Sequence, residues 1–368
     1  MKVTITRETL LKPLSMTSHI ISRQQTLPIL SNVLLVIQNE QLTITATDLE
    51  IELVTKVNID TKQYIAYTLP ARKLTDICKT LPNEAEITLE FKENKVILRS
   101  GQGRYMMSTL IAEDYPRIEV NTAVHKIQLK ESALKKLLDK TAFSMAQQDV
   151  RYYLNGLLFE IQQDQIRVVA TDGHRLSIAE TEVKHNLTEE TQIIIPRKAI
   201  IELGRILNKD GEETADIVFN HTHFQVIVGE TCFTTKLIDG QFPDYENILP
   251  SEQQAKQLKA DREQLKQVLT RTSVLSNEKF CSTCFKIQND TLCLHVNNSE
   301  NDEAEEKLNI DYTGESLDIG FNVAYFLDVL QVIQTEQIQL IFTSADASTL
   351  IKPVGEEDHR YIVMPMRL

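Results

Sequence analysis

An internal repeat constrains the fold of this 368-residue chain more than any other feature. The stretch VLLVIQNEQLTITATDLEIELVTKV at 33–57 and the stretch LLFEIQQDQIRVVATDGHRLSIAETEV at 157–183 both read as strand, polar turn, strand, Ala-Thr-Asp and strand. A weaker copy, FKIQNDTLCLHVNNSENDEAEEKLNI, covers 285–310 and has Asn297 and Asn298 in place of the Thr-Asp pair. Self-similarity of this kind indicates one structural unit used several times. We therefore predict three similar domains, at 1–125, 126–250 and 251–368.

Each copy also contains two stretches with helical periodicity. Apolar residues recur three and four positions apart before the strands, at Leu10, Leu11 and Leu14, then Leu134, Leu137 and Leu138, then Leu265, Val268 and Leu269. They recur after the first strands at Leu74, Ile77, Cys78 and Leu81, then Ile200, Leu203 and Leu207, then Phe326, Val329, Leu330 and Ile333. Pro13 is incompatible with a regular helix interior, so we expect the first helix to start or bend there. With the alternating strands that follow each second helix, the pattern predicts an α+β fold.

The segment TDGHR at 171–175 has the composition of a catalytic cluster. Its Thr-Asp half recurs at Thr47 and Asp48, which favours a turn in which Asp172 accepts hydrogen bonds from backbone N–H groups. Gly173, His174 and Arg175 are absent from the other copies. Any function specific to this segment should therefore involve those three residues and their neighbours.

Motifs of catalysis and metal binding are missing from the sequence. It has no phosphate-binding loop, no zinc-protease motif and no nucleophile elbow. Cys281 and Cys284 form a single Cys-x-x-Cys on a predicted strand, where positions i and i+3 face opposite sides. The five cysteines lack disulfide-framework spacing, and no leader or membrane-spanning run is evident. We therefore expect free thiols, no metal, no cofactor, no catalytic residue and a cytoplasmic location without membrane contact.

Charge is distributed unevenly along the chain. The formal net charge is -13, yet the predicted helices contain fifteen basic and seven acidic residues, which gives them +8 and leaves -21 for the rest. If the helices lie on one side of a continuous sheet, that side is positive and suits sequence-independent contact with nucleic-acid phosphates. Such contacts are weak and salt-sensitive. A closed ring would hold such a protein on DNA by topology.

Words spread over the whole chain resemble the bacterial replicative sliding clamps, the β subunits of DNA polymerase III. They are TLPILSN (26–32), TDLE (47–50), PARK (70–73), SMAQQDVRYYLNG (144–156), VATDGHRL (169–176), FPDY (242–245), LSNEKF (275–280), FNVAYFLDVL (321–330) and YIVMPMRL (361–368). The resemblance implies a head-to-tail homodimer whose six similar domains form a ring around double-stranded DNA, with helices lining the inner face and antiparallel sheets outside. It implies a nucleoid-associated, non-catalytic processivity factor that tethers the replicative polymerase. The clamp loader, other polymerases and repair proteins would bind through short peptide motifs.

The resemblance also assigns residues to three surfaces. The DNA-contacting residues are Arg23, Gln24, Arg72, Lys73, Gln148, Arg151, Tyr152, Tyr153, Arg197 and Lys198. The partner-peptide groove between the middle and last domains comprises Leu154, Thr171, Gly173, His174, Arg175, Leu176, Pro243, Asn247, Ile248, Asp346, Ser348, Ile362, Met364, Pro365, Met366, Arg367 and Leu368. The dimer interface joins Arg104, Tyr105 and Met107 to Val274, Leu275, Glu303, Glu305 and Glu306.

Three departures from the family pattern and two alternative functions stand beside this assignment. The basic residue expected just before TLPIL is Arg23, one place early, with Gln24 in its slot, so either could contact DNA. Asp346 stands where an apolar residue is usual and Asn247 where a basic one is frequent, which predicts altered peptide preference. The alternatives are a peptide-binding scaffold that does not encircle DNA and a thiol or metal enzyme using Cys281 and Cys284.

Overall fold

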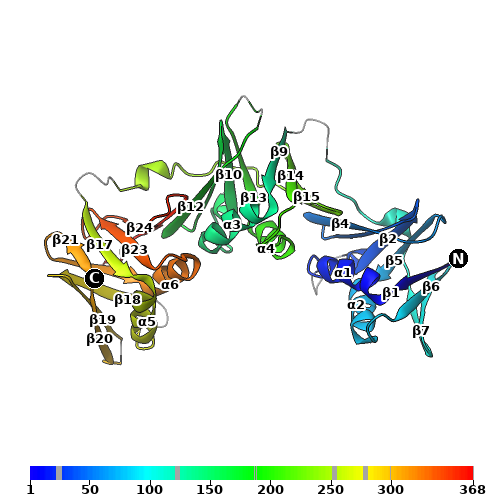
Figure 1. Ribbon diagram of the computed structural model, residues 1–368, viewed down its shortest axis with the longest axis horizontal. Coiled ribbons are helices and arrows are strands. Elements are labelled where there is room, and N and C mark those ends of the chain that lie inside the picture. Colours follow the sequence, from blue (N-terminus) through cyan, green and yellow to red (C-terminus); the bar gives the residue numbers. More distant parts are fainter. Residues whose placement is uncertain are drawn as a thin grey trace. The chain divides into compact units, whose positions relative to one another are not determined.

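The computed structural model describes residues 1–21, 27–120, 125–185, 187, 189–250, 255–276, 281–298 and 300–367 (Figure 1). They form two compact units. The first unit comprises Met1–Leu134 and Ile201–Leu237, and the second comprises Lys135–Ile200 and Ile238–Leu368. Each unit therefore combines a terminal third of the sequence with half of the predicted middle domain. The domain boundaries near 125 and 250 remain a prediction.

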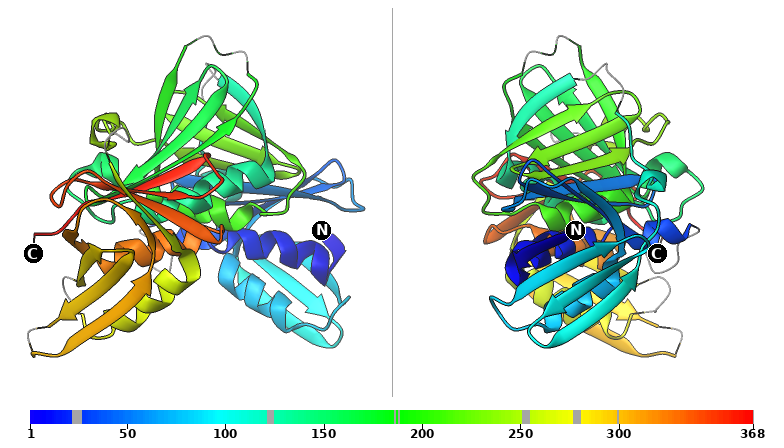
Figure 2. Two further views of the ribbon diagram at one scale, coloured as in Figure 1. Left: turned by 60° about the vertical axis from the view of Figure 1, so that its left-hand side comes forward. Right: turned by 90° about the vertical axis from the view of Figure 1, so that its right-hand side faces the viewer.

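The first unit contains two antiparallel sheets. The larger has eight strands in the order β5 (Ile65–Pro70), β2 (Asn32–Gln38), β3 (Gln41–Thr47), β4 (Ile51–Asn58), β16 (Thr231–Lys236), β15 (His223–Val228), β14 (Thr214–Phe219) and β9 (His125–Lys130). The smaller has four, in the order β1 (Lys2–Thr6), β6 (Glu86–Lys92), β7 (Lys95–Ser100) and β8 (Gly103–Ser108). Helices α1 (Arg7–Thr17) and α2 (Ala71–Thr80) contact each other (Figure 2) and the strands of the larger sheet.

The second unit repeats this plan. Its larger sheet has nine strands in the order β13 (Thr191–Pro196), β10 (Gly156–Gln162), β11 (Gln165–Thr171), β12 (Arg175–Glu182), β25 (His359–Val363), β24 (Thr349–Pro353), β23 (Gln337–Phe342), β17 (Lys256–Asp261) and β21 (Asp311–Thr313). Its smaller sheet has the order β20 (Glu303–Asn309), β19 (Thr291–Asn297), β18 (Ser282–Gln288) and β22 (Leu317–Asn322). Helices α5 (Arg262–Ser273) and α6 (Val323–Val332) pack together in this unit, and α3 (Glu131–Thr141) and α4 (Arg197–Ile206) have residues in both units.

Side-chain caps and apolar stripes explain where the helices form. Thr6 accepts a hydrogen bond from the Thr9 backbone N–H at the start of α1, and Asp261 does the same for Gln264 in α5. Helix α1 begins at Arg7 and continues through Pro13, so it does not start at that proline. Burial of its apolar side, with Leu10 and Leu14 fully buried, offsets the backbone hydrogen bond that the proline lacks.

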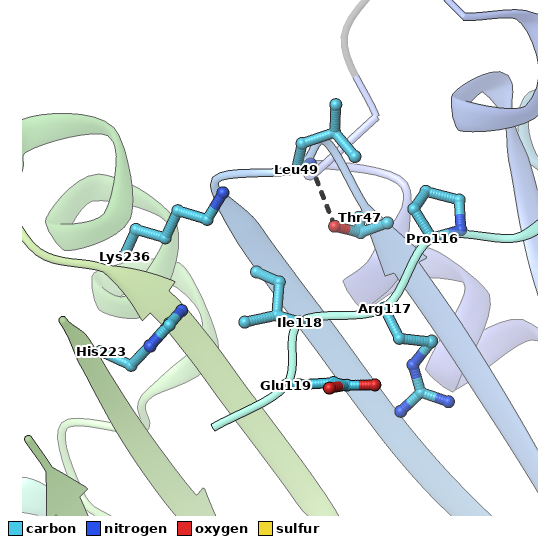
Figure 3. A pocket seen from close by; sticks show the side chains of 8 residues that line it. All are labelled: Thr47, Leu49, Pro116, Arg117, Ile118, Glu119, His223 and Lys236. Carbon is cyan, nitrogen blue, oxygen red and sulfur yellow. Dashed lines mark hydrogen bonds between the residues drawn. The ribbon is translucent and has the colours of Figure 1, made fainter. Parts of the chain in front are cut away.

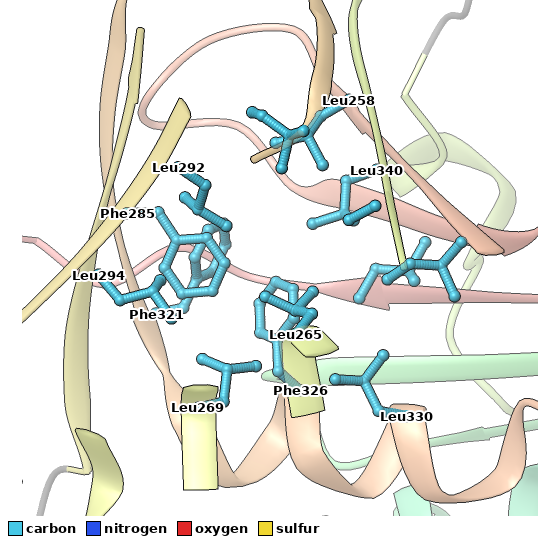
Figure 4. Packing of buried hydrophobic residues seen from close by; sticks show 14 of the residues in the cluster. Leu258, Leu265, Leu269, Phe285, Leu292, Leu294, Phe321, Phe326, Leu330 and Leu340 are labelled. Carbon is cyan, nitrogen blue, oxygen red and sulfur yellow. The ribbon is translucent and has the colours of Figure 1, made fainter. Parts of the chain in front are cut away.

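The core of the second unit shows how the helices are held against the strands. Phe285, Phe321 and Phe326 meet with ring centroids 4.8 to 5.1 Å apart, within the range that aromatic pairs favour (Figure 4). Leu265 and Leu269 of α5 are fully buried in the same cluster. Truncating a leucine of this kind to alanine costs about 2–5 kcal/mol, so the apolar stripe fixes the side that α5 turns to the sheet.

Two strand pairings join different thirds of the sequence in the same register. Strand β4 pairs with β16 from Ile51 opposite Thr235, and β12 pairs with β25 from Arg175 opposite Val363. The pairing is extended by matching backbone bonds, from Lys236 N to Glu50 O at 3.0 Å and from Met364 N to His174 O at 2.8 Å. Neighbouring copies of the sequence repeat are therefore joined by equivalent strand pairings.

Candidate functional site

The turn between β11 and β12 is built by the side chains of Thr171 and Asp172. The Thr171 hydroxyl donates to Arg175 O at 2.6 Å and accepts from Gly173 N at 3.0 Å. An Asp172 carboxylate oxygen accepts from His174 N at 2.9 Å and from Arg175 N at 3.0 Å. These four bonds satisfy polar groups of the turn within the turn itself.

The first copy of the repeat makes the same turn. Thr47 donates to Ile51 O at 2.8 Å and accepts from Leu49 N at 3.1 Å, and Asp48 accepts from Glu50 N at 2.9 Å and Ile51 N at 2.7 Å. Leu49 occupies the position of Gly173 with φ of 79°, against 88° for the glycine. The predicted structural role of the Thr-Asp pair is confirmed.

The third copy preserves the cap with a longer turn. Asn298 accepts from the backbone N–H groups of Glu300 and Asp302, both at 2.9 Å. An amide oxygen supplies the same acceptor as a carboxylate oxygen. Asn298 therefore has the role of Asp48 and Asp172 in the other two copies, as the weaker repeat predicted.

Arg175 is specific to the middle copy and is largely buried, with 12% of its side chain exposed. Its guanidinium donates to Asp172 at 3.1 Å, to the Asp328 carboxylate of α6, and to Phe143 O at 2.9 Å. It also lies 4.7 Å from the centroid of the Tyr325 ring, a cation–π distance. Arg175, which the resemblance assigned to the partner-peptide groove, connects β12 to α6 inside the second unit.

Arg151 covers the same turn from outside. Its guanidinium forms an ion pair with Asp149 at 2.8 Å and donates to Asp172 O at 3.2 Å. Hydrogen bonds from Arg151 lower the pKa of the Asp149 carboxyl to about 2. A β-carbon on Gly173 would lie 3.0 Å from this guanidinium and would need a backbone conformation that only glycine adopts easily. Glycine at position 173 therefore leaves room for this guanidinium and adopts the positive φ without strain.

An apolar cluster lies around this turn and joins β10, β11 and β12 to β23, β24 and β25. Its buried members are Ala146, Leu154, Leu158, Val169, Leu176, Ile178, Ile194, Phe242, Tyr245, Ile341, Leu350 and Ile362. Tyr153, Ile238, Ile248, Leu249 and Ala255 pack against it while partly exposed. Four residues assigned to the groove, Leu154, Leu176, Ile248 and Ile362, meet in this cluster.

The remaining groove residues lie at different depths. Thr171 is buried, Ser348, Met364, Pro365 and Met366 are half-buried, and Gly173, His174, Pro243, Asn247, Asp346 and Arg367 are exposed. Ser348 donates to Ile248 O at 2.9 Å, which ties the 246–248 turn to the start of β24. Leu368 lies outside the described residues.

The residues assigned to DNA contact fall on two kinds of element. Arg72 and Lys73 are exposed in the first turn of α2, and Arg197 and Lys198 occupy the first turn of α4. Arg197 donates to Met145 O at 2.7 Å, and burial and then the charge of Arg175 lower its pKa. Gln148, Arg151, Tyr152 and Tyr153 lie on the segment after α3. Arg23 and Gln24 lie outside the described residues.

The charge asymmetry persists within the observed helix boundaries. Helices α1 to α6 contain fourteen basic and seven acidic residues, a net of +7. Several of the basic groups are paired, as in Lys135 with Asp139 and Arg205 with Glu202. Among the described residues Lys73 has no ion-pair partner, so part of the positive charge is free for an external anion.

The residues assigned to the dimer interface lie mainly on β8 and β20 or at the end of α5. Arg104 and Tyr105 are exposed on β8, and Val274, after α5, is 77% exposed. Met107 is buried at 5%, whereas Met106 is 56% exposed. Adjacent residues of a strand face opposite sides, so Met107, which the resemblance assigned to the interface, faces the core of its own chain, and Met106 is the methionine that points outward.

The β20 and α5 side of this set is rich in ion pairs. Glu306 pairs with Arg271 of α5 at 2.6 Å, Glu305 pairs with Lys307 at 3.1 Å, and Glu303 lies 3.4 Å from His295. Leu275 lies with Val274 in the turn after α5. The acidic run therefore presents carboxylates along an edge strand.

Thiol and metal chemistry find little support in the described structure. Burial raises the pKa of Cys78 to about 11 and also raises that of Cys284, which disfavours reactive thiolates. Among the described residues, Glu356, Asp358 and His359 converge closely enough to hold an ion. The Lys140 ammonium, however, lies 2.7 Å from His359 Nδ1 and 3.0 Å from Asp358, and thereby occupies the ligand atoms with a cation of its own. Within the described chain no helix is long and apolar enough to cross a membrane.

Comparisons with known proteins agree along the whole chain. Family models of the DNA polymerase III beta subunit match in order, the N-terminal domain at 1–119, the central domain at 128–244 and the C-terminal domain at 246–367. The chain is similar to the beta sliding clamps of Pseudomonas putida, at 46% identity, and Escherichia coli, at 41%, with full coverage of both chains.

Solved structures show the same likeness. A sliding clamp of Pseudomonas aeruginosa bound to griselimycin superposes with a TM-score of 0.96 at 45% identity. A clamp of Bartonella birtlesii, also bound to griselimycin, gives 0.96 at 33% identity, and both comparisons cover all of each chain. The fold expected from the sequence, three clamp domains of helices and antiparallel sheets, is confirmed.

Proposed function

The chain belongs to the DNA polymerase III beta subunit family, the bacterial sliding clamps, and we propose that two copies close head to tail into a ring around duplex DNA. The ring tethers the replicative polymerase and performs no bond chemistry of its own. Because the sequence has no phosphate-binding loop, a separate nucleotide-using loader opens it. The protein works in the cytoplasm, at the nucleoid.

The observation that supports a dimer is that the chain has two small sheets, each of about half the size of the larger ones. Within the chain, β4 meets β16 and β12 meets β25, and each pairing completes a sheet of eight or nine strands. The smaller sheets have four strands each and end in β8 and β20, the counterparts of β16 and β4 in the repeat. An edge strand offers unpaired N–H and C=O groups to another chain. Pairing β8 of one copy with β20 of another would form between two chains the strand pairing that β16 and β4 form within one chain.

The register of the intrachain joint predicts the contacts of this interface. Cys232 lies opposite Val54 in the β4–β16 pair, and the corresponding residues of the free edges are Arg104 and Glu305. An arginine and a glutamate opposite each other across antiparallel strands stabilise the pairing. Two such interfaces, related head to tail, close a ring rather than extend a filament.

We propose that the apolar cluster is the binding site for partner peptides. Ile248 is half-buried against the buried cluster, and Met364 and Met366, also half-buried, directly follow β25; methionine adapts its shape to different apolar side chains. Exposed His174 and Arg367 supply polar contacts at its border. Asp346 and Asn247 are both exposed, and we propose that these two departures from the family pattern change peptide preference. The partners would be the polymerase, the loader and repair proteins.

The proposed DNA contacts are sequence-independent. Arg72, Lys73 and Lys198 are exposed at helix starts, and the tyrosine pair Tyr152 and Tyr153, with ring centroids 5.8 Å apart, offers surfaces for unpaired bases.

Retention on DNA of different topology tests the proposal. The protein is loaded onto nicked circular DNA with its loader and ATP, washed at high salt, and measured again after the circle is cut. Retention on the circle and release from the linear product are expected for a topological link. Equal retention on both would favour the alternative, a peptide-binding scaffold that does not encircle DNA. Metal analysis of the purified protein addresses the enzyme alternative and should find no stoichiometric metal.

A further inference from the structure

A pocket of about 370 Å³ lies in the first unit, where β4 pairs with β16 (Figure 3). It is lined by Thr47, Leu49, Pro116, Arg117, Ile118, Glu119, His223 and Lys236. Figure 3 shows Ile118 between the strand ends that carry Thr47 and Leu49 on one side and His223 and Lys236 on the other. No function proposed so far uses this pocket.

The pocket occupies the same place in the repeat as the apolar cluster of the second unit. Thr47 and Leu49 make the turn bonds that Thr171 and Gly173 make in the other copy. Lys236 corresponds to Met364. The backbone N of Lys236 bonds to Glu50 O and that of Met364 bonds to His174 O, and each of these carbonyls lies three positions after the threonine of its turn.

Two further elements of the pocket match. His223 corresponds to Ser348. His223 lies opposite Lys236 in the β15–β16 pair, and Ser348 directly precedes Thr349, which lies opposite Val363, the residue before Met364, in the β24–β25 pair. The segments DYPRI and DYENI, at 114–118 and 244–248, align by their buried tyrosines. This alignment equates Arg117 with Asn247 and Ile118 with Ile248. Six of the eight lining residues therefore fall on positions assigned to the partner-peptide groove.

The two sites differ in charge. Where the second unit has Met364, Ser348 and Asn247, the pocket has Lys236, His223 and Arg117. Arg117 is held by Glu52 through bonds of 2.8 and 3.3 Å, which neutralise most of its charge locally. Lys236 is exposed, and no carboxylate among the described residues lies within ion-pair distance of it. Glu119 is the single acidic group of the lining.

An apolar surface lies beside the free ammonium. Leu49 is 37% exposed and is held at φ of 79°, where its side chain lines the pocket, and Pro116 and Ile118 are half-buried next to it. An apolar recess next to an unpaired cation complements an aliphatic side chain next to a carboxylate.

We propose that this pocket is a second docking site, which binds a short acidic segment of a partner protein through an aliphatic side chain and an adjacent aspartate or glutamate. The choice of a peptide as ligand rests on the peptide-binding role proposed for the corresponding apolar cluster. The position of the pocket and its charge are independent of that role.

Titration of the full-length protein with two matched peptides tests the site. The acidic probe is acetyl-Ser-Leu-Asp-Leu-Glu-Ser-amide, and its neutral partner has Asn and Gln in place of Asp and Glu. Methyl NMR of isoleucine and leucine reports on the pocket through Ile118 and Leu49, and on the apolar cluster through Ile248. We expect saturable shifts at Ile118 and Leu49 with the acidic peptide and much smaller shifts with the neutral one.

Two lysine substitutions complete the experiment. Lys236→Met installs the residue of the corresponding cluster and should raise the Kd of the acidic peptide at Ile118 roughly tenfold, because a charge-assisted contact is lost. Lys56→Met, at an exposed lysine of β4 outside the lining, should leave that Kd unchanged. Absence of saturable shifts at Ile118, or equal effects of both substitutions, would overturn the inference. Shifts at Ile248 alone would overturn it while leaving the proposed function standing.

Discussion

At the scale of single residues, two arginines contact the Thr171–Asp172 turn in different surroundings. Arg175 is 12% exposed and bonds two carboxylates and a backbone carbonyl, whereas Arg151 is 46% exposed, pairs with one carboxylate, that of Asp149, and donates to Asp172 O. Removing a buried, multiply bonded charge leaves its partners unsatisfied, while an exposed pair contributes little. Burial therefore distinguishes them better than residue type does.

We expect Arg175→Ala to reduce the free energy of unfolding by about 2–4 kcal/mol, because Asp172 and Phe143 O lose their donor. Arg151→Ala, at the same turn, should change it by less than about 1 kcal/mol. Urea unfolding followed by tyrosine fluorescence measures both, since the chain has no tryptophan. A similar loss in the two variants would show that Arg175 is not the internal connection described here.

His359 makes stability depend on pH. It is 2% exposed, and burial, followed by the charge of Lys140, lowers its pKa despite the hydrogen bond with Asp358. Glu356 and the Tyr361 ring also face it. A histidine with a lowered pKa in the folded state contributes stability that is present above its unfolded pKa of about 6.5 and is lost as pH falls through the folded value.

The wild-type protein should therefore become less stable as pH falls from 7 to 5, and His359→Asn should reduce that dependence. The urea midpoint at several pH values measures it. The control is His221→Asn, at an exposed histidine, which should keep the wild-type slope. An unchanged slope in His359→Asn would mean that other groups, such as His223 with its own lowered pKa, account for the dependence.

At the scale of elements, local sequence predicted the turns and helices but not the strand pairings that join one copy of the repeat to the next. The Thr-Asp repeat identified both turns, because their hydrogen bonds join residues at most four positions apart. The contact of Arg175 with Asp328 spans 153 positions, and Met106 is external only because of how β8 packs. Pairings such as β4 with β16 depend on the assembled sheet, so the division of the middle third between two units was not readable from periodicity.

The proposed β8–β20 pairing predicts a charge-swap result. Arg104→Glu should weaken the dimer, because the exchanged side chain would face Glu305 of the other copy, and like charges opposite each other destabilise strand pairing. Glu305→Arg should weaken it as well, and the double variant should recover most of the wild-type affinity. Sedimentation equilibrium measures the dimer dissociation constant of all four proteins.

The control for this swap is Lys126→Glu, at an ion pair with Asp216 on another strand pair. It should leave dimerisation unchanged. If the Arg104 and Glu305 substitutions act additively, with no recovery in the double variant, the two residues are not opposite each other and the proposed register is wrong.

At the scale of the whole molecule, the proposed ring separates how the protein contacts DNA from how it stays on DNA. Phosphate contacts release counterions, so each one lost should reduce the slope of log affinity against log salt by about one. A closed ring needs no such contact to remain on a circle. The two properties should therefore respond to different substitutions.

The double variant Arg72→Ala with Lys73→Ala should bind linear duplex more weakly, with a salt slope smaller by about two. Once loaded on nicked circular DNA it should be retained at high salt as well as the wild type, because the edge strands β8 and β20, which we propose close the ring, are untouched. Arg104→Glu should show the reverse, with a nearly normal salt slope but rapid loss from the circle. If the double variant were lost from circles while still dimeric, charge rather than closure would hold the protein on DNA, and the ring would not be the basis of processivity.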